Sequence, residues 1–208
     1  VPKSRGEGPA VGPRSLPVEP PGVGSAMNWF ETVVSRPRLL IGYKDLQIGT
    51  KNALERELAS SVLLDLMFGR SSAFYQKHYE SGLIDDGFSF SYNSETPFGF
   101  AMIGGETDEP EKLTEEILKE IERVQSAKLL AKDIERSKKK RIGRYLRAFD
   151  TPDGAAFLHL GYLFRDLDPF SVPKAIDRLN LEAVTQRARE LFDSRNYAIS
   201  VVAPKKGA

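Results

Sequence analysis

Two short runs in the middle of the chain alternate between large apolar and small side chains, and they constrain the fold most. The first run spans residues 88–92 and the second spans residues 98–102, with a turn over residues 94–97 between them. A period of two places the large side chains on one face of a strand. The sequence therefore predicts a β-hairpin that buries one of its faces.

Two further strands and several helices are predicted around this hairpin. The apolar run at residues 38–43 and the β-branched run at residues 197–202 predict strands. Apolar residues at helical spacing predict helices over residues 52–68, 71–82, 108–124, 129–149, 153–165, 172–179 and 180–191. This order lacks the strict strand–helix alternation of a doubly wound sheet. It predicts an α+β fold, in which helices cover one face of a mainly antiparallel sheet.

The first 27 residues differ in composition from the rest, since they hold six of the 13 prolines and five of the 17 glycines. Such a segment cannot build a core, because proline removes a backbone donor and glycine is costly to order. Residues 1–27 are therefore predicted to be a linker or a disordered tail, and residues 28–208 a single α+β domain. A linker at this place implies that another segment precedes it.

The chain offers few metal-binding or nucleophilic side chains. It has no cysteine, and its two histidines, His78 and His159, lie 81 positions apart. These facts exclude a thiol nucleophile, cysteine-ligated zinc and a helical pair of zinc-binding histidines. We therefore predict that this chain holds no metal and no cofactor.

Charge and hydropathy exclude further classes of function. Thirty Lys and Arg residues face 29 Asp and Glu residues, and the resulting net charge of +1 does not favour nucleic acid or a membrane surface. No apolar stretch reaches 18 residues, and Lys3 and Arg5 lead into prolines and glycines rather than into a signal peptide. We predict a soluble, cytoplasmic protein with no nucleic-acid or membrane partner.

One basic stretch departs from this balance. Nine Lys and Arg residues lie between positions 128 and 147, against Asp133 and Glu135 alone. The acidic helix before it balances this charge, so a solvated or ion-paired helix face is favoured, with an RNA or phosphate partner as the alternative.

Lys138 falls on the apolar stripe of this helix, where a lysine must pair, snorkel or face a cavity, and snorkelling is the commoner outcome.

Three other features are candidate functional sites. His78 lies close in sequence to Asp85 and could form an acid–base pair, but an ordinary surface histidine is favoured. His159 lies on an apolar helix and is interpreted as a core or subunit-contact residue. Gly104-Gly105 could hold an anion before the next helix, but the full phosphate-loop pattern and its lysine are missing, and a turn is the simplest explanation. None of these features predicts catalysis by this chain.

The order of several motifs resembles the second half of pitrilysin/insulinase-type zinc metallopeptidases. The motifs are Gly69-Arg70-Ser71-Ser72, the segment that ends in Gly82-Leu83, residues 98–105, the helix from Asp108, Arg136-Ser137-Lys138-Lys139-Lys140, and residues 181–199. The resemblance covers residues 28–204, and the YmfH-like zinc proteases of bacteria are the branch it resembles most.

The resemblance implies a function. Members of this family contain two related α+β halves, joined by a linker, that enclose an extended peptide substrate. Their zinc motif, an inverted H-x-x-E-H, belongs to the first half and does not occur here. The chain is therefore expected to be the non-catalytic C-terminal half, which closes the peptide-binding chamber opposite a zinc-bearing half. That half would lie in the same polypeptide or in a partner subunit, and zinc is expected only there.

Taken alone, the chain is predicted to be inactive. The alternative is a stand-alone protein-interaction module that uses the same fold without peptidase activity.

The resemblance also implies substrate contacts. In many members the second half supplies an Arg and, seven positions later, a Tyr, which are suitable donors to a developing oxyanion. Alignment on Gly82-Leu83 places His78 and Asp85 there, and alignment on Ser71-Ser72 moves the first position to Tyr79. Neither alignment retains the pair, so no catalytic residue is predicted. The predicted substrate contacts are His78, Tyr79, Asp85 and Lys138.

Overall fold

The computed structural model describes residues 20, 22–48, 52–95, 98–126 and 129–205. The elements, in chain order, are β1 Met27–Thr32, β2 Arg38–Asp45, α1 Ala53–Phe68, α2 Ala73–Glu80, β3 Ser89–Ser94, β4 Gly99–Glu106, α3 Pro110–Ser126, α4 Ala131–Arg147, α5 Pro152–Leu163, α6 Val172–Arg178, α7 Leu181–Leu191 and β5 Tyr197–Pro204. Most of the predicted linker, residues 1–27, lies outside the described residues.

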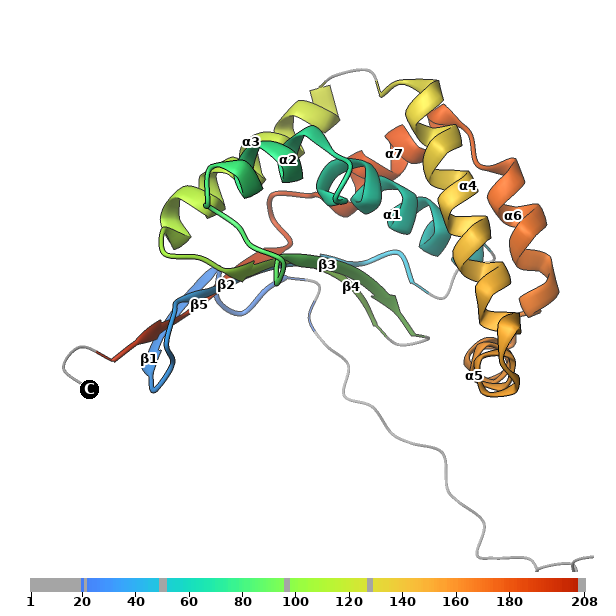
Figure 1. The fold of residues 1–208 in the computed structure, drawn as a ribbon, viewed down its shortest axis with the longest axis horizontal. Coiled ribbons are helices and arrows are strands. Elements are labelled where there is room, and N and C mark those ends of the chain that lie inside the picture. The colour runs from blue at the N-terminus through green and yellow to red at the C-terminus, as the bar shows by residue number, and fades with distance from the viewer. Residues whose placement is uncertain (1–19, 21, 49–51, 96–97, 127–128, 206–208) are drawn as a thin grey trace, which may run out of the picture.

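The strands form one sheet in the order β1-β5-β2-β4-β3. Three of its pairs are antiparallel, including the β3–β4 hairpin, and β1 pairs with β5 in parallel. Helices α1, α2, α3 and α7 lie over one face of the sheet, while α4, α5 and α6 form the end of the molecule farthest from β1 (Figure 1). The predicted α+β fold, a mainly antiparallel sheet covered on one face by helices, is confirmed.

The core lies between the sheet and α1. This helix packs against α7, α4 and α6 as well as against β3, and it buries residues around most of its circumference, as a central helix must. Alternate residues of β2, among them Leu39 and Ile41, are buried, and this strand packs against α3 and α7 beside α1. Two predicted helix starts are also confirmed, since Ser72 caps α2 and Asn180 caps α7 through their side-chain oxygens.

Two features of the sheet differ from the prediction. Strand β1 was not predicted. It lies at the sheet edge and none of its residues is buried, so its sequence shows no regular alternation of apolar and polar residues. Gly104-Gly105 forms neither a turn nor an anion site, but lies inside β4 between β2 and β3. Glycine is required there because a Cβ on Gly104, at φ +157°, would lie 2.0 Å from the Leu39 carbonyl oxygen.

Among the described residues, no helix is both long enough and apolar enough to cross a bilayer.

Candidate functional site

Two of the four predicted substrate contacts, Tyr79 and Asp85, line one cavity. This Tyr79 cavity has a volume of about 420 Å³ and lies where the segment after α2 meets the start of β2 and the end of β4. Its other lining residues are Arg38, Asp86, Gly87, Gly105 and Glu106. The Tyr79 ring is half exposed and stacks on Tyr75 at 5.5 Å between centroids. The cavity thus combines an exposed phenol with three carboxylates and a guanidinium.

Asp85 is held in place by Arg36. Arg36 Nη1 donates to Asp85 Oδ2 at 2.8 Å, and Arg36 Nε donates to Asp108 Oδ1 at 3.1 Å. The hydrogen bond to Asp108, followed by the contacts with Asp85, raises the pKa of Arg36 above its ordinary value. The second oxygen of Asp85 accepts from the Gly87 amide at 2.8 Å. Asp85 is therefore a well-ordered wall of the Tyr79 cavity.

His78 does not share this cavity, and the prediction that it is a surface histidine is wrong. The side chain is buried, packs on Phe74 and places Nε2 3.2 Å from Glu116 Oε2. Burial, with the nearby charge of Lys77, lowers the pKa of His78 below 6.5, so the ring is mostly neutral at pH 7. The α2 helix turns His78 inward while the adjacent Tyr79 faces out, and the acid–base pair with Asp85 is not formed.

Lys138 lies elsewhere, on α4, and it pairs instead of snorkelling. Its Nζ donates to Glu135 Oε1, to the Asp177 carbonyl and to the Leu179 carbonyl, each at 2.9 Å. These carbonyls lie at the C-terminus of α6, where a cation is favoured. All three donors of the ammonium are occupied.

The substrate-contact role of the four residues stays a prediction, and the geometry favours Tyr79 and Asp85.

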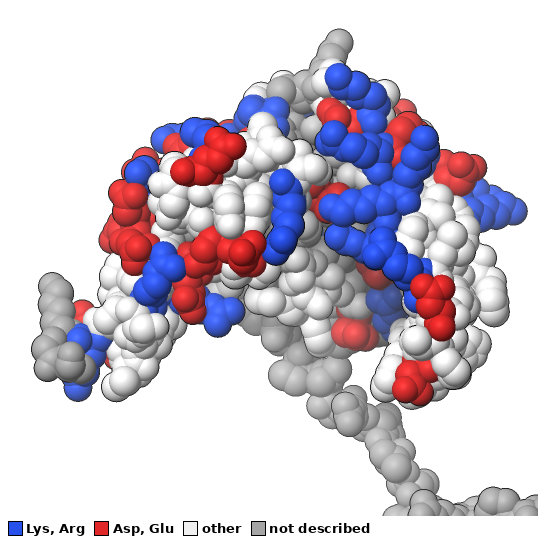
Figure 2. All heavy atoms as spheres, viewed as in Figure 1, with Lys and Arg blue, Asp and Glu red and all other residues white. Residues whose placement is uncertain are grey.

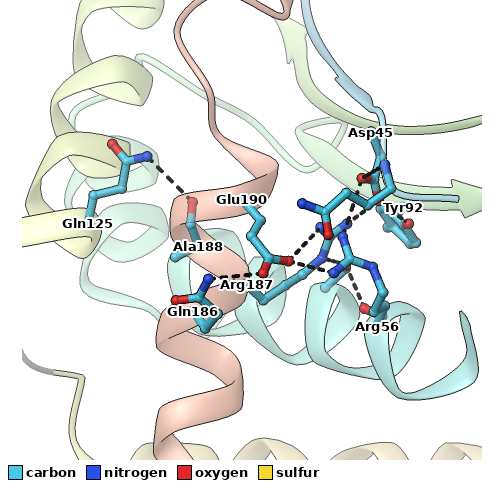
Figure 3. Close-up of polar contacts among 10 residues, drawn as sticks. Asp45, Arg56, Tyr92, Gln125, Gln186, Arg187, Ala188 and Glu190 are labelled. Carbon is cyan, nitrogen blue, oxygen red and sulfur yellow. Dashed lines mark hydrogen bonds and ion pairs between the residues drawn. The ribbon is translucent and has the colours of Figure 1, made fainter. Parts of the chain in front are cut away.

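A buried ionic network, which sequence reasoning missed, lies deeper in the molecule (Figure 3). Arg187, on α7, is 2% exposed and binds the equally buried Asp45 at the end of β2. Arg187 Nε also donates to Ser60 Oγ at 2.7 Å, and Tyr92 Oη donates to Asp45 Oδ2 at 2.6 Å. A second guanidinium, Arg56, binds Glu190 at 2.5 Å. The network joins β2, β3, α1 and α7 across the core.

The electrostatics of this network follow from burial and pairing. Burial alone would raise the pKa of Asp45, but the charge of Arg187 and the hydrogen bond from Tyr92 hold it below its ordinary value. Burial and the bond to Asp45 raise the pKa of Tyr92 to about 12. The network therefore holds two ionised carboxylates, Asp45 and Glu190, against two guanidiniums at neutral pH, and it fixes the relative positions of the elements that it joins.

A second cavity lies between α4, β3, the end of α1 and the start of α2. This basic cavity has a volume of about 580 Å³ and includes the side chains of Arg70, Arg136, Lys140 and Arg144. Lys and Arg side chains gather over α4, whereas acidic and basic side chains are mixed over the side of the same view that holds α2 and α3 (Figure 2). The face of α4 combines the two predicted states, ion-paired and solvated, because Lys140 binds Asp65 while Arg144 is exposed and has no ion-pair partner among the described residues.

The end of the molecule around α5 is apolar and exposed. This α5 patch consists of Leu146, Phe149, Phe157, Leu160, Leu163, Phe164 and Phe170. Phe157 and Phe164 are 76% and 81% exposed, and α5 has no fully buried residue. His159 is exposed here too, so its interpretation as a core residue is wrong, while that as a subunit contact stays a prediction.

No metal centre can be built from the described part of the chain. It contains no group of three or more His, Cys, Asp or Glu side chains placed to hold a metal ion. His78 is buried against Glu116, and His159 lies on the exposed α5. These residues do not fit zinc, which needs at least three protein ligands in a catalytic site.

Comparison with known proteins identifies close relatives. Residues 5–141 match the family model described as the peptidase M16 inactive domain. The chain is 37% identical over 175 residues to the uncharacterized zinc protease YmfH of Bacillus subtilis. The aligned residues cover 83% of this chain and 40% of that protein.

Solved structures agree with this match. The crystal structure of an M16-like peptidase from Alicyclobacillus acidocaldarius superposes with a TM-score of 0.86 and 32% identity, over 91% of this chain and 46% of that one. The inactive peptidase domain of a zinc protease from Bordetella parapertussis shares the fold, with a TM-score of 0.70 and 13% identity, over 86% of this chain and 98% of that one. The chain thus spans less than half of the YmfH and Alicyclobacillus relatives.

Proposed function

Because this chain belongs to the peptidase M16 family as its inactive domain, we propose that it closes the peptide-binding chamber of a zinc-dependent peptidase opposite a zinc-bearing half. The chain is the non-catalytic C-terminal half in this arrangement. The stand-alone interaction module, the alternative predicted from the sequence, gains no support from these relatives.

The α5 patch is the observation that carries this proposal. Large contiguous apolar surfaces are rare on domains that work alone, and they mark sites of association. Three phenylalanines of the patch, Phe157, Phe164 and Phe170, are each at least 68% exposed. Aromatic side chains of this kind are typical anchors of protein interfaces. The relatives supply the missing partner, since more than half of their length lies outside the part that matches this chain.

Zinc would come from the other half, because the side chains described here do not fit it. When bound there, zinc lowers the pKa of a water molecule and makes it a nucleophile near neutral pH. This chain would contribute walls of the chamber, with Tyr79 and Asp85 as the favoured contacts to a peptide. The phenol of Tyr79 can donate to a peptide carbonyl, and the carboxylates of the Tyr79 cavity can accept from peptide amides.

The proposal extends to the organisation of the whole protein. Residues 1–27, rich in proline and glycine, would be the linker between the halves, and residues 28–208 the inactive half. The absence of cysteine is compatible with a reducing compartment, and a cytoplasmic location is proposed on that ground.

Pairing through the α5 patch can be tested by co-purification. The 208-residue chain, with a tagged zinc-bearing M16 half of the same organism, is expected to elute as one complex. The double variant Phe157→Ser/Phe164→Ser should weaken pairing at least about tenfold without unfolding the chain, since both side chains are exposed. The control is Phe30→Ser, which removes a 57% exposed aromatic from β1 at the other end of the molecule. Equal pairing by all three proteins, or none by the wild type, would refute the proposal.

A further inference from the structure

We propose that the basic cavity binds a carboxylate of a peptide, in which an acidic residue lies next to an apolar one. The inference deepens the proposed function, because it names a class of substrate. It rests on the proposed function in one respect: that function is the reason to expect a peptide as the ligand. The binding of an oxyanion rests on the cavity itself.

One wall of the basic cavity is a row of cations on α4. Arg136, Lys140 and Arg144 recur at intervals of four residues, which places them on one face of the helix. Arg70 faces them from the segment between α1 and α2. Among the residues that line the cavity, Asp65 is the only carboxylate, so four cations share one anion.

The existing ion pairs leave most of this charge available. Asp65 is committed to Lys140 at 2.5 Å and to Ser137 at 3.1 Å. Arg70 and Arg136 make exposed contacts of 3.3 Å and 3.4 Å, with Asp86 and Asp133 respectively. Exposed pairs of this kind contribute little and are readily exchanged. Together with Arg144, which has no ion-pair partner in the described part of the chain, they leave three guanidinium groups able to turn to an anion. Guanidinium matches a carboxylate in a bidentate geometry.

Tyr75, one of the residues that line the basic cavity, carries a buried donor without a partner in the part of the chain that the structure describes. Tyr75 is 7% exposed, and its hydroxyl is buried with no hydrogen-bond partner among the described residues. A buried polar group without a partner is costly, and such groups are rare in native proteins. Burial raises the pKa of Tyr75, so the hydroxyl stays a donor across the neutral range. An oxygen atom of a bound ligand would satisfy it.

The shape and lining of the cavity indicate what else the ligand carries. Its volume of about 580 Å³ exceeds that of a single inorganic ion and falls in the range of small-ligand sites. Phe90, which is half-buried, lines it beside the cations together with the buried Phe68 and Phe88, so the anionic group should be joined to an apolar one that can contact Phe90. An RNA strand fits less well, because binding single strands needs aromatic rings on which bases stack, and Phe68 and Phe88 are buried.

Binding can be measured on the 208-residue chain by fluorescence anisotropy. The probe is an amidated, fluorescein-labelled peptide of sequence Ala-Leu-Glu-Phe-Leu-Ala, and the matched probe has Gln in place of Glu. We expect the Glu peptide to bind at least about tenfold more tightly, because a hydrogen bond to a charged group is stronger than one to a neutral group. Its affinity should fall as salt is added. Equal affinity for the two peptides would overturn the proposal.

Two pairs of substitutions locate the site. Arg136→Gln/Arg144→Gln should weaken the Glu peptide at least about tenfold, whereas Lys139→Gln/Arg147→Gln removes the same charge from α4 outside the cavity and should change affinity less than about twofold. Tyr75→Phe should weaken binding about fivefold while leaving stability unchanged or higher, since the lost hydroxyl had no partner. Equal losses from the two double variants would show nonspecific attraction and refute the site.

The remaining outcomes are also decisive. Inorganic phosphate or an RNA oligomer that binds where the Glu peptide does not would reassign the basic cavity and overturn the peptide ligand. Failure of this proposal is distinguishable from failure of the proposed function, because pairing with the zinc-bearing half is tested by Phe157 and Phe164, which do not line the cavity.

Discussion

At the scale of single residues, Arg187 decides how the core is held together. Burial of a guanidinium costs several kcal/mol, and the cost is offset only if its donors find good acceptors. Asp45 and Ser60 accept from Arg187, and its guanidinium lies 5.3 Å from the centre of the Tyr92 ring. Since these partners come from three elements, one side chain fixes their relative positions.

Arg187→Leu should therefore destabilise the chain by about 3–5 kcal/mol, because the buried Asp45 would lose the cation bonded to it and keep only Arg56, whose Nη2 lies 3.5 Å from Asp45 Oδ1. The free energy of unfolding is measured by urea titration. Arg189→Leu, on the exposed side of α7, is the control and should change stability by less than about 0.5 kcal/mol. Similar losses for both variants would mean that the network contributes little.

Glu116 predicts how stability depends on pH. Hydrogen bonds from Lys77 and then Lys119 lower the pKa of Glu116 from 4.5 to about 2. A carboxyl whose pKa is lower in the folded protein stabilises the fold above pH 4.5, and this contribution is lost as pH falls toward 2. Glu116→Gln should therefore flatten the fall of unfolding free energy between pH 5 and about pH 2. Glu115→Gln, which alters a more exposed neighbour, should leave the slope nearly unchanged. A wild-type slope in Glu116→Gln would contradict the prediction.

At the scale of elements, the sequence predicts what packs on one side and misses what depends on distant partners. The hairpin was predicted because burial of one face leaves a period of two in the sequence, and the cap of α7 because Asn180 is itself a capping residue type. α1 was predicted from apolar residues at helical spacing, although it is buried around most of its circumference. β1 has no buried face, so its sequence shows no such period. The site residues were harder, because the direction of His78 and the acceptors of Lys138 are set by α3 and α6.

The sequence does carry a signal for the buried network, in the position of Arg187 on α7. Arg187 lies three residues after Val184 and one before Ala188, on the inward side of α7, in the way that Lys138 lies on the stripe of α4. A charge on an apolar stripe indicates a buried partner. Which carboxylate it binds could not be predicted, since Asp45 is 142 positions away in the chain.

Gly104 tests the packing of β4 against β2. Gly104→Ala should destabilise the fold by about 2–3 kcal/mol, because the new Cβ would collide with the Leu39 backbone at a φ that alanine rarely adopts. The opposite sign is expected for Gly143→Ala in α4, where a Cβ meets nothing within 4 Å, and the gain should be about 0.5–1 kcal/mol. Thermal and urea unfolding measure both changes. A neutral Gly104→Ala would disprove the close approach.

At the scale of the whole molecule, charge is separated although the net charge is only +1. The predicted balance between the acidic and basic helices is not made by direct contact. Ion pairs of α3, such as Lys119–Glu116 and Arg123–Glu120, lie within that helix, and Lys77–Glu116 joins it to α2, but none among the described residues joins α3 to α4. The cations of α4 lie over a different part of the surface (Figure 2). A nearly neutral chain therefore presents a basic region that its composition does not reveal.

The proposed division of labour predicts that the chain alone does not cleave peptides. With excess zinc, it should give no chelator-sensitive turnover of a fluorogenic peptide, because its described residues offer no group of metal ligands. Addition of a zinc-bearing half should produce turnover that a chelator abolishes. Chelator-sensitive cleavage by the isolated chain, reproduced in separate preparations, would reverse the assignment.

The placement of β5 between β1 and β2 has a consequence for biosynthesis. A ribosome delivers β1 some 165 residues before the strand beside which it lies, because residue 32 precedes residue 197 by that distance. Until β5 emerges, Trp29 and Phe30 have no neighbouring strand, and β2 lacks one of its two partners. Closing such a distant pair is slow, and an unpaired strand edge invites aggregation in the meantime. We therefore expect the nascent chain to depend on chaperones until its last strand is released.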